Sequence, residues 1–160
     1  MNAELVIRPE RPDQPEVLAL LSALDAYLAS LYAPEDNHIL GVDQLLADDV
    51  RFLTARRGGV AVGCGAVRRM PAEADTGGRP YGEIKRMFVA PAQRGQRIAE
   101  AVLVELEAAL RSQGIGLALL ETGRDQAEAL RLYRRAGYAV RGPFGGYPDN
   151  GLSVFMAKAL

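Results

Sequence analysis

The chain has 160 residues, 49% of them hydrophobic and 24% charged, which is ordinary for a globular protein and predicts one domain spanning residues 1–160. The formal net charge of −1 and the lack of a long basic run argue against a nucleic-acid partner. A single cysteine and a single histidine argue against an internal disulfide and a His/Cys metal site, so no metal is expected. No signal-peptide pattern and no long apolar span occur, so we expect a cytoplasmic protein without a membrane partner.

The N-terminal third predicts a strand followed by a helix. Residues 4–8 (ELVIR) alternate as a strand does. Asp13 followed by Glu16 resembles a capping box, which predicts that the helix begins there. Apolar residues then recur at helical spacing as far as Leu31, so one face of this helix is expected to be buried.

The middle of the chain predicts an antiparallel meander. A polar connector over residues 33–41 and a short helix over residues 42–46 precede it. Gly58-Gly59 is typical of a hairpin turn, while Gly63 and Gly65 inside the next strand indicate a bulge or a close approach of another group. The three predicted strands cover residues 50–55, 60–67 and 81–89.

Helices and strands alternate in the second half. Apolar periodicity predicts a helix from Ile98 that stops at Gly114, and Asp125 with Glu128 is expected to cap another helix. A strand–helix–strand order implies a parallel pair of strands joined by a crossover, in contrast to the antiparallel first half. The predicted fold class is therefore mixed α/β, with α+β character. The predicted strands of this half cover residues 117–120, 138–141 and 152–156.

The segment from Gly82 to Ala99 carries the clearest functional signal. A strand leads into a turn at Pro91, and the basic, Gly-containing loop after it opens a helix. The first N–H groups of a helix have no internal partner and lie at the positive end of the helix dipole, so such a loop can bind phosphate. The carboxylate of Glu83 lies on the strand that feeds this loop.

Three motifs in this order resemble those of the GNAT family of N-acetyltransferases. The loop RGQRIA at residues 94–99 is similar to the family's pyrophosphate loop, [Q/R]-x-x-G-x-[G/A], although Arg97 stands where the family usually has glycine. EIKRMFV at residues 83–89 matches its carboxylate-bearing strand, and ALRLYRRAGY at residues 129–138 matches its A-x-x-L-Y helix. LETG at residues 120–123 and the SVFMAK tail are similar to a bacterial subgroup.

The resemblance implies the GNAT fold: a central, mostly antiparallel sheet with a splayed parallel strand pair, flanked by about four helices. It also implies acetyl-CoA as co-substrate, an amine attacking the thioester directly, and a homodimer as one assembly. The expected acceptor is the amine of a small molecule or an amino acid. A protein or peptide amine is the alternative within the enzyme class, and a catalytically silent acyl-CoA-binding module is the alternative outside it.

The resemblance assigns catalytic roles to Glu83, as the base that deprotonates the amine, and to Tyr133, as the acid that protonates the departing thiolate. From the residues alone, Glu83 could equally pair with Lys85 on the same strand face, and Tyr133 could be a core side chain. The pyrophosphate and the pantetheine arm are expected on these cofactor-binding residues: Met87, Phe88, Val89, Arg94, Gly95, Gln96, Arg97, Ile98, Ala99, Gln126 and Tyr133.

The acceptor pocket is expected near the connector of residues 32–38. Glu35 could hold a cationic amine there, with Asp36 beside it. His38 is either a further acceptor contact or an ordinary surface residue, and Tyr147 could close the pocket from the Gly-rich loop before the last strand.

Overall fold

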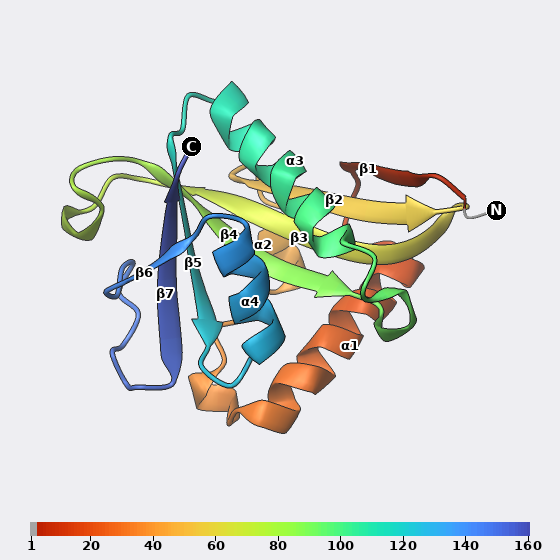
Figure 1. The fold of residues 1–160 in the computed structure, drawn as a ribbon, viewed down its shortest axis with the longest axis horizontal. Helices are drawn as coiled ribbons and strands as arrows, with labels where there is room; N and C mark the ends of the chain where they lie inside the picture. The colour runs from red at the N-terminus through yellow and green to blue at the C-terminus, as the bar shows by residue number, and fades with distance from the viewer. Residues whose placement is uncertain (1–2) are drawn as a thin grey trace.

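Seven strands form one mixed sheet in the order β1-β2-β3-β4-β5-β7-β6, as seen in the computed structural model, which describes residues 3–160 (Figure 1). Only β4 and β5 run parallel, and every other neighbouring pair is antiparallel, as predicted. The strands are β1 (Leu5–Pro9), β2 (Val50–Arg57), β3 (Val60–Met70), β4 (Tyr81–Val89), β5 (Leu117–Gly123), β6 (Ala139–Arg141) and β7 (Ser153–Ala159).

Helices cover both faces of the sheet. Helix α1 buries Val17 and Leu21 in one apolar cluster with Phe88, whereas α3 and α4 contribute Val102 and Tyr133 to a separate cluster on the opposite face. No helix among residues 3–160 is long and apolar enough to cross a membrane. The helices are α1 (Pro15–Leu31), α2 (Val42–Leu45), α3 (Ile98–Ser112) and α4 (Ala127–Arg135), with 3-10 turns at η1 (Pro34–Asp36), η2 (Ala74–Thr76) and η3 (Pro91–Gln93).

The predicted capping boxes are wrong at both helices, although the helices themselves are present. Helix α1 begins after Gln14 without a side-chain cap, because the Asp13 carboxylate accepts a 2.8 Å bond from Arg11 instead. Helix α4 likewise begins after Gln126 without a side-chain cap. Pro15 at the first position of α1 has no N–H that needs a cap, whereas no side chain replaces the predicted bonds at α4.

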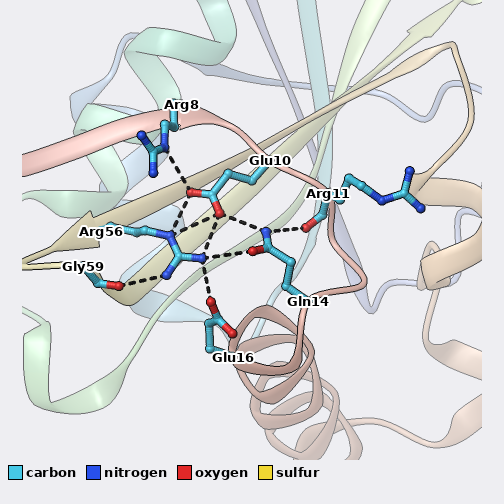
Figure 2. A network of polar contacts seen from close by, with 7 residues as sticks. All are labelled: Arg8, Glu10, Arg11, Gln14, Glu16, Arg56 and Gly59. Atoms are coloured by element: carbon cyan, nitrogen blue, oxygen red, sulfur yellow. Dashed lines mark hydrogen bonds and ion pairs between the residues drawn. The ribbon is translucent and has the colours of Figure 1, made fainter.

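A charged network fixes the start of α1 to the sheet (Figure 2). The Arg56 guanidinium on β2 bonds the carboxylates of Glu10 and Glu16, each at 2.8 Å, and donates to the Gly59 carbonyl at 2.9 Å. Arg56 lowers the pKa of Glu10 by hydrogen bonding to its carboxylate. The network therefore joins the end of β1, the first turn of α1 and the hairpin that follows β2.

Strand β4 separates from β5 soon after the two strands meet. Their pairing is limited to Gly82–Ala118 and Glu83–Leu119. Beyond this point β4 carries a bulge, because it contributes one more residue than β3 between the pairs Cys64–Phe88 and Ala66–Lys85. The parallel pair is therefore splayed, as predicted, and the edge of β4 that faces β5 is left open.

Two features of the chain make room for the bulge: a left-handed residue on β4 and a glycine opposite it on β3. Arg86 has φ = 59°, a conformation that is uncommon for a residue with a side chain. On β3, a Cβ at Gly65 would lie 2.4 Å from the Met87 sulfur, which confirms the close approach expected from the glycines of this strand.

Candidate functional site

A cavity of about 550 Å³ lies at the open end of β4, between the start of α3 and the face of α4. Ten of the residues predicted to bind the cofactor line it, whereas Gln96 is absent from its wall. These ten are Met87, Phe88, Val89, Arg94, Gly95, Arg97, Ile98, Ala99, Gln126 and Tyr133. The structure thus brings together two segments that lie far apart in the sequence.

The loop before α3 presents backbone donors to this cavity. None of the N–H groups from Gly95 to Ala99 donates to a described residue. Gly95 and Arg97 have φ values of 81° and 61°, so Arg97 adopts the left-handed backbone that the glycine usual at this position would take. The loop therefore keeps the shape of an anion-binding helix start despite the arginine.

Arginines line the same cavity. The Arg94 Nε donates to the Val89 carbonyl at 3.2 Å, and its guanidinium lies 5.5 Å from the centre of the Phe88 ring. Arg131 and Arg135 of α4 add positive charge opposite the loop, although Arg135 is paired with Glu100 at 2.7 Å. No sequence motif marks these two α4 arginines as part of the site, because only the fold turns this face of the helix toward the loop.

A second, smaller cavity of about 120 Å³ lies between α1, the connector after it, and the splayed strands. Tyr133 lies where it meets the first cavity, and only 6% of its surface is exposed. Burial raises the pKa of the Tyr133 phenol, so the hydroxyl keeps its proton and can donate. Five residues line both cavities: Leu24, Met87, Gln126, Ala129 and Tyr133.

The connector brings only part of its predicted acceptor residues to the small cavity. His38 and Asp36 line it, whereas Glu35 is exposed and is absent from its wall. Successive residues of a 3-10 turn point about 120° apart, so η1 cannot direct both carboxylates to one side. Glu35 therefore lies outside the wall of this cavity, whereas Asp36 is part of it.

Glu83 is buried beneath Tyr147 and lines neither cavity. The Tyr147 hydroxyl donates to its carboxylate, and the Lys85 Nζ lies 3.4 Å from the same oxygen. Tyr147 also lies outside both cavity walls, with its ring edge-on to His38 at 5.1 Å between centres. Burial and the nearby Glu83 charge raise the pKa of Tyr147. A direct proton transfer from substrate to Glu83 is not supported by this geometry.

Glu121, a carboxylate that sequence reasoning passed over, lines the small cavity. Ser153 on β7 donates to its Oε2 at 2.6 Å, and the Nδ1 of His38 lies 3.6 Å from that oxygen. The apolar run that predicts this strand ends at Leu120, because the next residue is charged. The signal was in the alternation along β5, which turns Glu121 to the same side as Leu119.

Comparisons with known proteins agree with this arrangement. Residues 11–138 match the model of a family described as the acetyltransferase (GNAT) family. An IAA acetyltransferase of Azospirillum brasilense is 47% identical over 156 residues, covering 98% of each chain. The crystal structure of a Klebsiella pneumoniae protein assigned as an acyl-CoA N-acyltransferase is 38% identical, with a TM-score of 0.78 and 99% of each chain covered. PaiA N-acetyltransferase of Thermoplasma acidophilum, solved with coenzyme A, shares the fold at 18% identity and a TM-score of 0.74, with 98% of this chain and 99% of that chain covered.

Proposed function

Because the chain belongs to the GNAT family of acetyltransferases, we propose that it transfers the acetyl group of acetyl-CoA to the amine of a small molecule. One observation carries the proposal: a loop with free backbone N–H groups faces the large cavity, and Tyr133 lies where that cavity meets a small polar one. A phosphate-bearing acyl carrier and a separate acceptor require two sites that meet at the reacting atoms.

The large cavity suits the carrier. The N–H groups of Gly95 to Ala99 would receive the pyrophosphate, with Arg94 beside them. The pantetheine arm would lie along the open edge of β4, pairing with its backbone as an added strand does, and Gln126 would bond its amides. The thioester would then lie near Tyr133.

The residues where the two cavities meet suit direct transfer of the acetyl group from the thioester to the amine. Attack of the amine on the thioester carbonyl creates an oxyanion, which the N–H of Met87, a bulge residue without a register partner on β3, would stabilise. Tyr133 would donate its proton to the departing thiolate. General acid assistance of this kind typically accelerates a reaction by about 10²–10⁴-fold.

The size of the small cavity, about 120 Å³, favours a small acceptor over a protein or peptide chain. The relative named an IAA acetyltransferase supports the same choice. A catalytically silent acyl-CoA-binding module is the rival from a different class, because the loop alone would explain carrier binding. The presence of polar groups in a second cavity favours the enzyme.

Calorimetry with acetyl-CoA tests the carrier site. Arg94→Glu should weaken binding by about 10-fold or more, because it reverses a charge beside the pyrophosphate. Arg51→Glu is the matched control: it makes the same charge change at an exposed position of β2 outside this cavity and should leave the affinity unchanged. Equal affinity of wild type and Arg94→Glu would contradict the assignment.

Turnover with a panel of primary amines separates enzyme from binder. Ethanolamine, tyramine, putrescine, glycine and lysine sample the size and charge of small acceptors, and released CoA is detected with a thiol reagent. Cys64, the only cysteine of the chain, is 1% exposed, so the protein itself should add little signal. Binding of acetyl-CoA without turnover of any amine would support the silent module.

A further inference from the structure

The small cavity is the proposed acceptor site. The polar residues in and beside it divide into those whose hydrogen-bonding groups are all used within the protein and those with a group left over. Lys85 belongs to the first set: its Nζ lies 2.8 Å from the Tyr147 hydroxyl, 3.2 Å from the His38 carbonyl and 3.4 Å from Glu83. An ammonium group has three donors, so these contacts use all of them. Tyr147 accepts from Lys85 and donates to Glu83, so this trio forms a closed structural unit.

Glu121 belongs to the second set. Both of its contacts, from Ser153 and His38, are made to Oε2, and no residue of the described chain bonds its Oε1. Its side chain is 13% exposed and lines the cavity. A carboxylate in a cavity wall that is held by one oxygen has the other oxygen available to accept a hydrogen bond from a ligand.

His38 supplies an independent sign that this wall is incomplete. Its Nδ1 is buried and makes no hydrogen bond within residues 3–160. Buried nitrogen atoms are normally satisfied, and the Glu121 Oε2 lies 3.6 Å from this one, so the polar groups of this wall are not fully hydrogen-bonded to one another. Two members of the unit formed by Glu83, Tyr147 and Lys85 hold the histidine in place. Lys85 donates to its carbonyl, and the Tyr147 ring packs edge-on against its ring.

We infer that Glu121 receives the ammonium group of a small primary amine and removes its proton before acetyl transfer. The inference rests on the proposed function and names its acceptor site. Ser153 is a positioning residue that orients the carboxylate through its bond to Oε2, and His38 lies 3.6 Å from the same oxygen. Glu83, which cannot reach the cavity, positions His38 through Tyr147 and Lys85.

The proton balance of this step is complete. A proton passes from the ammonium group to Glu121, and the neutral amine attacks the thioester carbon, so a C–N bond forms and the C–S bond breaks. The thiolate takes the Tyr133 proton. Forming the amide removes a second proton from nitrogen, and this proton restores the Tyr133 phenol. The first proton leaves Glu121 to solvent, so both residues return to their starting state.

Steady-state kinetics of Glu121→Gln test the assignment with any panel amine that the wild type acetylates. This substitution keeps the size and the bond from Ser153 but removes the charge. We expect kcat/KM for the amine to fall by about 10²–10⁴-fold near neutral pH, while acetyl-CoA binds as before. The deficit should shrink as the pH rises toward the pKa of the amine, because more of the acceptor is then already deprotonated.

Glu83→Gln is the matched control, since it makes the same change in the buried trio. It should reduce kcat/KM by less than Glu121→Gln does, without the recovery at high pH. A larger loss in Glu83→Gln, or a Glu121→Gln rate within about three-fold of wild type, would overturn the role of Glu121 and leave the proposed function intact. Failure of the wild type to acetylate any amine would overturn both.

If Glu121→Gln does not fold, Ser153 provides a second test. Ser153→Ala should lower kcat by about 10-fold through lost orientation of Glu121, and Ser153→Thr, which restores a hydroxyl, should recover most of the rate. Equal rates in Ser153→Ala and wild type would contradict the inference.

Discussion

A Cβ atom at Gly123 would lie 1.8 Å from the hydroxyl oxygen of Tyr32, so the glycine that ends β5 leaves the space that this tyrosine fills. Tyr32 follows α1 directly, lines the small cavity and accepts a 3.2 Å bond from the Asp125 N–H. One contact therefore ties the end of α1 to the turn before α4, on the side of the cavity opposite the bulge.

Gly123→Ala should displace Tyr32 and disturb acceptor binding more than carrier binding. Gly123 does not have a positive φ, so the backbone tolerates alanine and the effect comes from the side-chain clash. We expect a loss of about 1–3 kcal/mol in the free energy of unfolding and a raised KM for the amine. The same substitution in a Tyr32→Ala background is the control: there it should cost almost nothing, and an undiminished cost would refute the clash.

Arg97→Gly should stabilise the protein while weakening the carrier site. A residue with a side chain at φ = 61° costs roughly 1 kcal/mol relative to glycine, and the 3.8 Å ion pair of the exposed Arg97 with Glu100 returns little of this. Urea unfolding should show a gain of about 0.5–1 kcal/mol. Acetyl-CoA affinity should fall a few-fold and depend less on salt, since one charge near the phosphates is lost.

Arg97→Ala separates the two effects, because it removes the charge but keeps the Cβ. It should lose affinity as the glycine variant does and gain no stability. Stabilisation by alanine equal to that by glycine would show that backbone strain at this position is not the cause.

Tyr133→Phe should lower turnover far more than it weakens acetyl-CoA binding. The buried phenol stays protonated because its pKa is raised, so it remains a donor throughout the neutral and mildly alkaline range. We expect kcat to fall by about 10²-fold or more in steady-state assays. Tyr138→Phe is the control: its ring lies 5.8 Å away and its hydroxyl bonds Glu107 at 2.9 Å, outside both cavities. That variant should lose about 1 kcal/mol of stability and keep its turnover; equal loss of kcat in both would argue against a donor role for Tyr133.

Glu10→Gln should destabilise the protein at neutral pH but not in acid. The folded pKa of Glu10 lies below its unfolded value, so as the pH falls the unfolded chain takes up the proton first. The stabilisation is fully present above a pH of about 4.3, the unfolded value for glutamate, and is lost as the pH falls through the lowered folded value.

Urea unfolding over this pH range measures the difference between wild type and Glu10→Gln. We expect about 2 kcal/mol at neutral pH, because a charge-assisted bond to a mostly buried arginine is lost, and a shrinking difference below pH 4 or so. Glu16→Gln, whose side chain is 49% exposed, should cost less than half as much at neutral pH. A difference for Glu10→Gln that persists unchanged into acid would rule out the ion pair as its source.

Most of the fold was predictable because apolar periodicity and glycine positions report directly on local structure. The hairpin at Gly58-Gly59, the span of β4 from Tyr81 to Val89 and the parallel pair all agree with the sequence analysis. The helix starts were not predictable to the residue. Asp13 had a competing partner two residues away in Arg11, and spacing alone cannot decide between a cap and an ion pair.

The motif of residues 94–99 was enough to predict the proposed acetyl-CoA loop, whereas no motif predicted which residues line the small cavity. Glu83 has the residue type and strand position of a base, but only the packing of Tyr147 over it shows that it is closed off. Glu121 belongs to the LETG motif, but the motif does not say which contacts its carboxylate makes, because these depend on Ser153 and His38, which lie on other segments of the chain. Contacts between distant segments of the chain cannot be predicted from the spacing of residues within one segment.

The two-residue pairing of β4 with β5 also means that the sheet is held together by fewer backbone hydrogen bonds there than between its other strands. The strands β1 to β4 form one block and β5, β7 and β6 another, and few ladder bonds cross between them. Amides beside that seam should exchange with solvent by local opening rather than by global unfolding. A pantetheine arm lying in the gap would supply the absent backbone partners. Bound acetyl-CoA would then join the two blocks as an added strand does, and they would unfold together.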